Sequence, residues 1–433
     1  MNKKFNNFFD INEKNIYIAY IFTFCIALFF TFFFRRGIEF ARYGLIILTI
    51  IILYFKKEYF KKILSDYIFF ILLMFIMISA VSLVYNNASI GKIDDAVNWT
   101  LCYIFGFLVF YILKKNSILI LFFIPIFLFL CQISYPFFTG TLIENLNFLS
   151  GKRLDLFFGG KPIHLGIFAG FSTFTGLYIF LRSDNRYIKI TYFILALTSF
   201  LVLLSTGTRT SFVGTTVTIA IMLLCFFYKK IRFSYLVIAT LSILTIASLL
   251  MLNKKEARIS SLADSEEVLD SFLERELIFI LAKDSFLRSP IIGEGFDRFS
   301  EIYQNNISTY SQQEGAQEKY AYILTSTNNA HNFSLHFLTE TGILGFLCMN
   351  GFWILIIRNG LKSKSDTAKI ISGIYLLSYI AFQFNMSLYG NQMSTLLFSL
   401  AGLSGAAFQD SKDNELDPDD TTNYPLIELK AFR

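Results

Sequence analysis

Charged residues are scarce in this chain. Only 16% of its 433 residues are Asp, Glu, Lys or Arg, whereas 55% are apolar; a soluble domain carries about a quarter charged residues. Apolar runs of about 18–21 residues recur along the sequence, and each is long enough to cross a hydrocarbon layer of about 30 Å. The composition therefore excludes a soluble globular protein and predicts a polytopic membrane protein.

Cysteine usage and net charge exclude further classes. All five cysteines fall inside apolar runs, none is placed to form a disulfide in an exported loop, and no CxxC pattern indicates a metal site. The net charge of +6 comes mostly from short basic junctions between the runs, so no nucleic-acid partner is expected. We also expect no cleavable signal peptide, because the first apolar run lacks a small-residue cleavage site.

The apolar runs predict an all-α fold with about twelve transmembrane helices. We place these helices at residues 17–34, 38–55, 67–85, 96–113, 117–134, 163–181, 188–205, 211–228, 233–252, 333–357, 368–388 and 391–408. The predicted organisation is nine helices within 1–252, a large outer loop at 253–331, three helices within 332–408, and a disordered tail at 409–433.

Basic residues at alternate junctions predict the orientation of these helices. They follow the second, fourth, sixth, eighth and tenth helices: Lys56, Lys57, Lys61 and Lys62; Lys114 and Lys115; Arg182, Arg186 and Lys189; Lys229, Lys230 and Arg232; Arg358, Lys362, Lys364 and Lys369. Because cytoplasmic loops carry the excess of Lys and Arg, these junctions and both termini are predicted to be cytoplasmic. Arg35, Arg36 and Arg42 lie on the outer side by this count and oppose the pattern.

The outer segment 253–331 is too long to be structureless in a compact protein. Asp264 and Glu267 resemble a capping box, and the residues that follow have helical periodicity up to Pro290. We therefore predict an amphipathic helix at 265–287, lying on the outer face of the membrane.

His331 is predicted to begin the tenth helix and to act as a general base. A helix N-terminus disfavours the imidazolium and so lowers its pKa, and a neutral imidazole accepts a proton. At about 100° per residue, Gly342 and Gly345 lie on the face beneath His331, which predicts a groove for an acyl chain or a close helix. His336 lies about 140° away on this wheel, so it is not expected to share the site. A capping histidine above a glycine packing face is the alternative.

Each of three other charged positions has two alternative interpretations. Glu340 lies inside a predicted helix, where an acid is expensive and usually faces the protein; it is either a buried partner of a basic residue or catalytic. Arg209, in "STGTRTSFVG", lies at an outer turn and suits phosphate oxygens, but an interfacial arginine also snorkels to headgroups. Arg275 is either a phosphate ligand or a surface ion pair, and Arg153 adds positive charge to the outer segment 135–162.

The predicted topology brings His331, Arg209 and Arg275 to the outer side. Two arginines and a neutral histidine suit a substrate that carries a phosphate and a hydroxyl to be activated. The charges collect at one face rather than along a path through the midplane, which favours chemistry over transport.

Three motifs then resemble a known family. "HNFSLHFLTETGILG" is similar to the His-Asn … Glu-x-Gly-x-x-Gly signature of the O-antigen ligase and polymerase superfamily. "LLSTGTRTSFVG" stands at that family's arginine turn, usually Ser-Arg-Gly, from which Thr208-Arg209-Thr210 departs. "ERELIFILAKDSFLRSPIIGEGFDRF" resembles its outer-loop pattern, with Arg275 at the functional arginine. The resemblance covers most of the chain.

The resemblance implies a membrane-embedded glycosyltransferase of the GT-C type, in the bacterial inner membrane. Such an enzyme transfers a glycan from undecaprenyl diphosphate on the periplasmic side, without a metal or other cofactor. It implies that His331 is the base or aligns the acceptor hydroxyl, and that Arg209 and Arg275 bind the donor diphosphate. Supporting roles are expected for further residues, namely Asn332, Glu340, Gly342, Gly345, Arg42 and Arg153.

The acceptor separates the two activities of the family. A ligase transfers the glycan to lipid A-core, and a polymerase transfers it to another undecaprenyl-linked repeat. Residues 33–70 resemble the second-helix region of enterobacterial ligases, including Gly37, Arg42 and Tyr43, and outer arginines suit the anionic lipid A-core. Ligase is therefore the favoured interpretation; polymerase is the main alternative and a polysaccharide transporter a lesser one.

Overall fold

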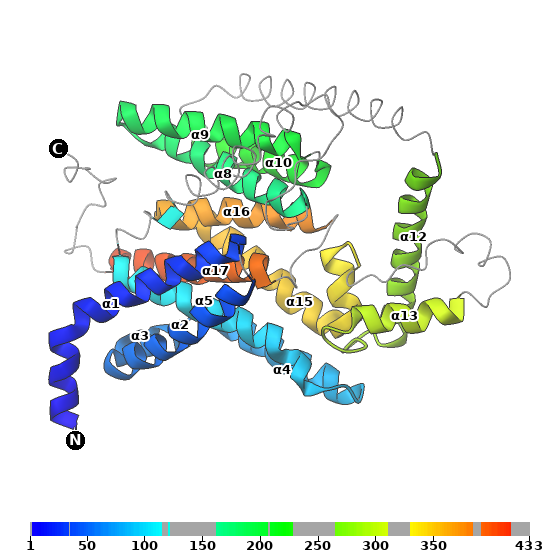
Figure 1. Cartoon of the computed structure of the whole chain (residues 1–433), viewed down its shortest axis with the longest axis horizontal. Coiled ribbons are helices and arrows are strands. Elements are labelled where there is room, and N and C mark those ends of the chain that lie inside the picture. Colours follow the sequence, from blue (N-terminus) through cyan, green and yellow to red (C-terminus); the bar gives the residue numbers. More distant parts are fainter. Residues whose placement is uncertain are drawn as a thin grey trace.

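The computed structural model describes residues 2–33, 35–114, 120–121, 162–206, 208–227, 265–310, 330–383 and 391–416. Every regular element in these ranges is a helix, as predicted (Figure 1). The elements are α1 (Asn2–Phe33), α2 (Arg35–Phe55), α3 (Lys57–Leu64), α4 (Tyr67–Tyr85), the short 3-10 helix η1 (Ile90–Ile93), α5 (Asp94–Leu113), α8 (Pro162–Arg182), α9 (Arg186–Ser205), α10 (Arg209–Phe227), α12 (Ser265–Arg288), α13 (Phe299–Tyr310), α15 (Phe333–Lys362), α16 (Asp366–Phe382) and α17 (Asn391–Leu416).

Six of the described helical segments are long and apolar enough to cross a membrane. They are Tyr67–Tyr85, Ile90–Leu113, Leu165–Arg182, Arg186–Leu204, Arg209–Phe226 and Phe333–Lys362. The protein is therefore an all-α, multi-pass membrane protein. Helices α1, α2, α16 and α17 coincide with four more predicted spans. The spans predicted at 117–134 and 233–252 fall outside the described residues apart from 120–121, so the count of twelve stays a prediction.

The C-terminal prediction needs a correction. Helix α17 continues to Leu416, so the first residues of the predicted disordered tail are helical. Polar side chains just past the apolar part hold this extension: Gln409 donates to the carbonyl of Lys62 at 3.4 Å, and the Ser411 and Ser363 hydroxyls lie 3.5 Å apart.

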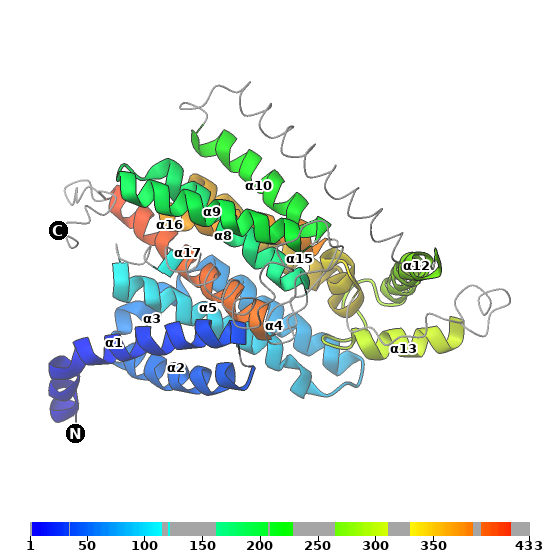
Figure 2. The same cartoon turned by 45° about the horizontal axis from the view of Figure 1, so that its top comes forward.

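The long helices run between two ends of one bundle. At one end, Arg182 of α8 pairs with Asp366 of α16 (Nε to Oδ2, 3.4 Å); this end carries the basic junctions, and we call it the basic end. At the other, Asn332 before α15 donates to the carbonyl of Gln383 after α16 at 2.8 Å. Helices α12 and α13 lie at this second end (Figure 2), which we call the loop end.

An aromatic cluster ties the loop end to the bundle. Trp99 of α5 stacks on Phe398 of α17, with ring centroids 5.0 Å apart. Phe296, which precedes α13, is fully buried and meets Trp99 and Phe75 of α4 edge to face, at 5.8 and 5.5 Å. The loop before α13 is thus anchored in the same core as the membrane helices.

Candidate functional site

Helix α15 is broken at Gly342, two residues after Glu340. The backbone there has φ 63° and ψ −164°, outside the helical region. A left-handed backbone is readily adopted only by glycine, which is why the break falls at this residue. A break inside an apolar helix frees backbone groups that must find other partners.

The segment between α12 and α13 supplies those partners. The N–H groups of Ile343 and Leu344 donate to the carbonyls of Pro290 and Ile291, at 2.8 and 3.3 Å. In return, the N–H groups of Glu294 and Gly295 donate to the carbonyls of Thr339 and Glu340, at 3.0 and 2.9 Å. Residues 290–295, which we call the clamp loop, therefore close the break from both sides.

Two glycines allow this close approach. A Cβ at Gly342 would overlap the backbone of Ile291, and a Cβ at Gly293 would overlap the backbone of Glu340. The predicted groove for an acyl chain beneath Gly342 and Gly345 is therefore wrong. The clamp loop covers Gly342, and a Cβ at Gly345 would meet the side chain of Thr341 in its own helix.

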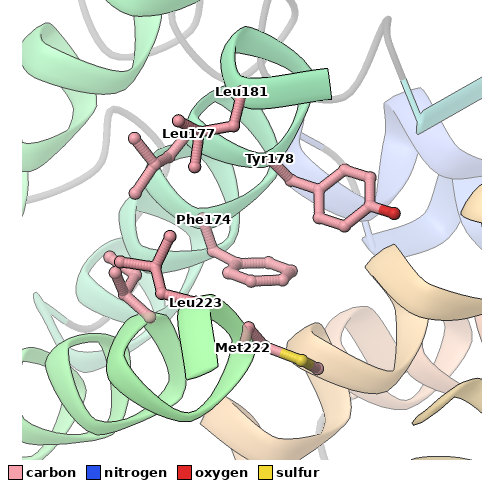
Figure 3. A pocket seen from close by; sticks show the side chains of 7 residues that line it. Phe174, Leu177, Tyr178, Leu181, Met222 and Leu223 are labelled. Carbon is pink, nitrogen blue, oxygen red and sulfur yellow. The ribbon is translucent and has the colours of Figure 1, made fainter. Parts of the chain in front are cut away.

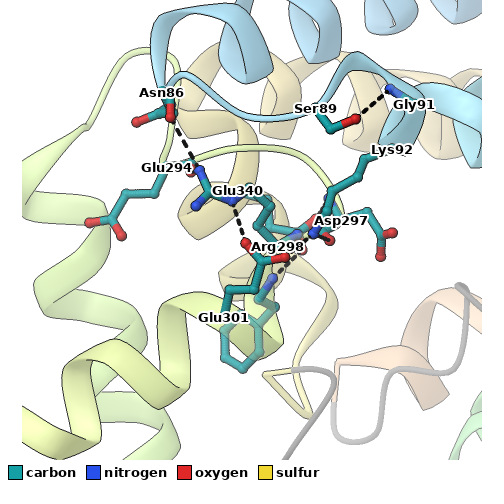
Figure 4. A network of polar contacts seen from close by, with 10 residues as sticks. Asn86, Ser89, Gly91, Lys92, Glu294, Asp297, Arg298, Glu301 and Glu340 are labelled. Atoms are coloured by element: carbon teal, nitrogen blue, oxygen red, sulfur yellow. Dashed lines mark hydrogen bonds and ion pairs between the residues drawn. The ribbon is translucent and has the colours of Figure 1, made fainter.

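Glu340 holds the start of α13. Its Oε1 accepts from the N–H groups of Arg298 and Phe299 at 3.0 and 2.9 Å, and its Oε2 accepts from that of Asp297 at 3.1 Å (Figure 4). The first N–H groups of a helix lack intrahelical partners and carry partial positive charge, so they bind a carboxylate well. The side chain of Glu340 is only 1% exposed, and these three backbone donors hold its two oxygens in place.

The titratable carboxyl of Asp297 lies beside Glu340. Partial burial is the main cause that raises the pKa of Asp297, and the nearby carboxylates of Glu340 and Asp95 raise it further, to about 7. The side chain of Asp297 also reaches solvent. Glu301 behaves in the opposite way: hydrogen bonds from Lys92 and Arg298 lower its pKa. The polar network at the loop end thus contains acids shifted in both directions (Figure 4).

Helix α12 carries Arg275 and packs on this network. Its bounds, Ser265–Arg288, confirm the helix predicted at 265–287; its position on the membrane face stays a prediction. Leu277 and Leu281 are buried in a small core with Phe299 of α13. At its end, the Arg288 guanidinium binds the carboxylate of Glu294 at 2.8 Å. Both ends of the clamp loop are therefore fixed to helices.

His331 does not lie in a helix. It has a left-handed backbone (φ 51°), is half-buried, and precedes Asn332, the N-cap of α15. Asn332 accepts from the N–H of Leu335 at 2.8 Å while donating to Gln383 of the neighbouring helix end. The helical-wheel relation between His331 and the glycines therefore does not hold, and Asn332 fixes the chain directly after the histidine.

His336 lies in the first turn of α15 and is buried. Its side chain is 1% exposed, and its Nδ1 accepts from the N–H of Ala330 at 3.3 Å. Its Nε2 lies 3.3 Å from Oε2 of Glu340, one turn further along α15. His336 is thus connected to the residue before His331, and the i, i+4 spacing of His336 and Glu340 was the available signal for their pairing.

Arg209 and Arg275 have exposed side chains. Arg209 begins α10 at the loop end, and Arg275 lies in the middle of α12. Within the described ranges, neither forms a hydrogen bond or ion pair, so the structure does not connect them to His331. Their exposure leaves both guanidinium groups available to a ligand.

Arg42 corrects a further expectation. It lies in α2, is only 7% exposed, and donates from Nη2 to the hydroxyl of Thr395 in α17 at 2.9 Å. Because it is buried between two helices, Arg42 is not an exposed contact for a lipid headgroup. Arg153 lies outside the described residues.

A separate apolar pocket lies between α8 and α10 (Figure 3). Its lining is Phe174, Leu177, Tyr178, Leu181, Ile219, Met222 and Leu223. The Tyr178 hydroxyl donates to Asp366 at 2.7 Å, near the basic end. The pocket is therefore far in the fold from the histidines and offers no acid–base pair of its own.

The helices and the polar loop end define a multi-pass membrane protein with candidate chemistry at one end of its bundle. A family model described as O-antigen ligase matches residues 194–349, less than half of the chain, but the match includes Arg209, Arg275, the clamp loop and His331. This match supports the O-antigen ligase and polymerase superfamily for that part of the chain. The search of curated proteins found no match.

Proposed function

We propose that this protein is an O-antigen ligase. It transfers a glycan from undecaprenyl diphosphate to a sugar hydroxyl of lipid A-core, on the periplasmic side of the bacterial inner membrane, with both termini cytoplasmic and a GT-C-type arrangement of its helices. The family match supports the class of reaction. The placement of His331, half-buried at the loop end and fixed on both sides by Ala330 and Asn332, is the observation that carries the proposal.

In the proposed reaction, the acceptor hydroxyl oxygen attacks the anomeric carbon of the donor. The new glycosidic bond forms as the bond to the diphosphate oxygen breaks, with inversion at that carbon. His331 accepts the hydroxyl proton, and undecaprenyl diphosphate leaves with the bonding electrons. Arg209 and Arg275 bind the diphosphate, so that positioning and charge stabilisation supply most of the rate increase. No metal is required in this scheme.

Polymerase activity is the second candidate, because the family match covers both reactions. The resemblance of residues 33–70 to enterobacterial ligases favours the ligase, but the buried Arg42 removes one expected contact with lipid A-core.

Lipopolysaccharide gels of a deletion strain separate the two candidates. Bare core together with long polymer on undecaprenyl diphosphate identifies a ligase, whereas core capped with a single repeat identifies a polymerase. Transfer by the purified protein from undecaprenyl-linked glycan to lipid A-core, with chelator present, tests the reaction and its metal independence directly. Absence of transfer to lipid A-core by correctly folded protein would contradict the ligase, and absence of chain growth on undecaprenyl-linked repeats as well would contradict both candidates.

A further inference from the structure

His336 is held between Glu340 and the backbone that leads into His331. Its Nδ1 accepts from the Ala330 N–H at 3.3 Å, so in a neutral ring the proton must be on Nε2. That nitrogen faces the Glu340 carboxylate at 3.3 Å. The carboxylate therefore favours the tautomer that leaves Nδ1 able to accept.

Glu340 is itself immobilised. Three backbone N–H groups at the start of α13 bind its two oxygens, and the Ser82 hydroxyl of α4 binds its carbonyl at 2.9 Å. The His336 ring also packs on the Phe299 ring, with centroids 5.2 Å apart. The contacts run without a gap from α13, through Glu340 and His336, to Ala330.

The backbone at His331 needs such support. A left-handed conformation at a non-glycine residue is strained and persists where the surroundings determine it. The His336–Ala330 hydrogen bond constrains the chain on one side of His331, and the Asn332 cap constrains it on the other. Without His336, the first of these constraints is lost.

We propose that His336 and Glu340 are positioning residues for the transfer reaction. They hold the backbone at Ala330 so that the His331 imidazole meets the acceptor hydroxyl, and they touch neither substrate. This inference rests on the proposed role of His331 as the base. It reverses the expectation that His336 does not share the site.

Two amide substitutions distinguish the hydrogen bond between His336 and the Ala330 N–H from the other contacts of the His336 ring. In His336→Asn, the side-chain oxygen lies near the former Nδ1 and still accepts from Ala330. In His336→Gln, the amide lies near the former Nε2, reaches Glu340, and leaves the Ala330 N–H without an acceptor. We expect kcat of the Gln variant to fall by about 10²-fold, the typical cost of a misplaced catalytic group, and the Asn variant to recover at least about tenfold of that loss. The donor KM should stay within about twofold for both, because Arg209 and Arg275 are unchanged.

A double-mutant cycle with His331→Ala completes the test. If His336 acts through His331, adding His336→Gln to His331→Ala lowers the residual rate no further. Equal kcat for the Asn and Gln variants, or a full second loss in the double variant, would overturn the positioning role even if His331→Ala kept its own loss of kcat. Wild-type turnover by His331→Ala would overturn the proposed role of His331 as the base, and this inference with it.

Discussion

The histidine and arginine parts of the candidate site are built in opposite ways. His336 and Glu340 are buried and hydrogen-bonded, and the backbone next to His331 is fixed on both sides. Arg209 and Arg275 are exposed and, in the described part of the chain, bind no other side chain. A proton acceptor must be aligned before the reaction, whereas a cation that receives a diphosphate avoids desolvation until the ligand arrives. The difference predicts that substitutions in the histidine part mainly change kcat, whereas substitutions of the arginines mainly change the donor KM.

Removing His331 should have the largest effect. His331→Ala is expected to lower kcat by about 10²–10⁴-fold, the usual contribution of a general base, with little change in the donor KM. Transfer by the purified variant, at matched protein amounts, measures this. His331→Gln sharpens the result: a Gln variant with substantial turnover would show that the residue aligns the hydroxyl and is not the base.

Removing either arginine should act on binding instead. Arg209→Ala and Arg275→Ala are each expected to raise the donor KM by about 10–10²-fold, since a hydrogen bond to a charged group contributes about 1.5–3 kcal/mol. Lysine should restore little, because it lacks the planar fork of guanidinium donors. Arg186→Ala, at an exposed position of the basic end, is the matched control and should behave as wild type. Near-normal KM in both alanine variants would leave snorkelling arginines as the explanation.

Replacing the glycine at the helix break should lower the stability of the folded protein. Gly342→Ala forces a Cβ into a left-handed backbone and against Ile291, at a cost of at least about 1–2 kcal/mol. Gly351→Ala is the control in the same helix, since a Cβ there meets nothing within 4 Å; it should stabilise by about 0.5–1 kcal/mol. Thermal unfolding in detergent compares the two, and equal melting temperatures would contradict the clamp.

The smallest effect concerns pH and Asp297. Its folded-state pKa of about 7 is above the ordinary value of 3.8, so between these two pH values the folded protein binds a proton that the unfolded chain does not. The contribution of Asp297 to stability is then complete below about pH 4 and is lost as pH rises through about 7. Asp297→Asn should flatten the melting temperature over that interval, to a degree limited by solvent screening.

Glu301→Gln is the control for that measurement. The pKa of Glu301 is lowered, so its contribution is present at neutral pH and is lost only below its usual titration range. The Gln variant should therefore differ from wild type at neutral pH and converge with it in acid. Identical pH profiles for wild type and Asp297→Asn would show that Asp297 is not the titrating group.

Apolar length was enough to predict the long apolar helices that the structure describes. The run predicted at 67–85 coincides with α4, because a membrane helix needs about 20 apolar residues and Asp66 caps its start, accepting from the Ile68 N–H at 2.9 Å. The loop helix α12 followed from capping and periodicity in the same way. Both signals are local in sequence, so both could be read from one chain.

The site depended on non-local contacts and was only partly predictable. The N-cap preference of Asn332 could have placed His331 outside the helix, and the spacing of His336 and Glu340 indicated a pair. The N–H donors to Glu340 lie at Asp297–Phe299, about 40 residues earlier, and no periodicity connects them. The break at Gly342 was also hidden, since the apolar pattern continues across it while the clamp loop satisfies the backbone.

The break also determines how deep the acidic residue lies. From Ile343 to Lys362, helix α15 rises about 30 Å at 1.5 Å per residue, which alone matches the hydrocarbon thickness. Glu340 lies level with Ser82, in the last turn of α4. If Ile343–Lys362 spans that layer, Glu340 lies at the boundary of the membrane, where backbone donors from a polar loop reach it, and the cost of an acid at mid-bilayer does not arise.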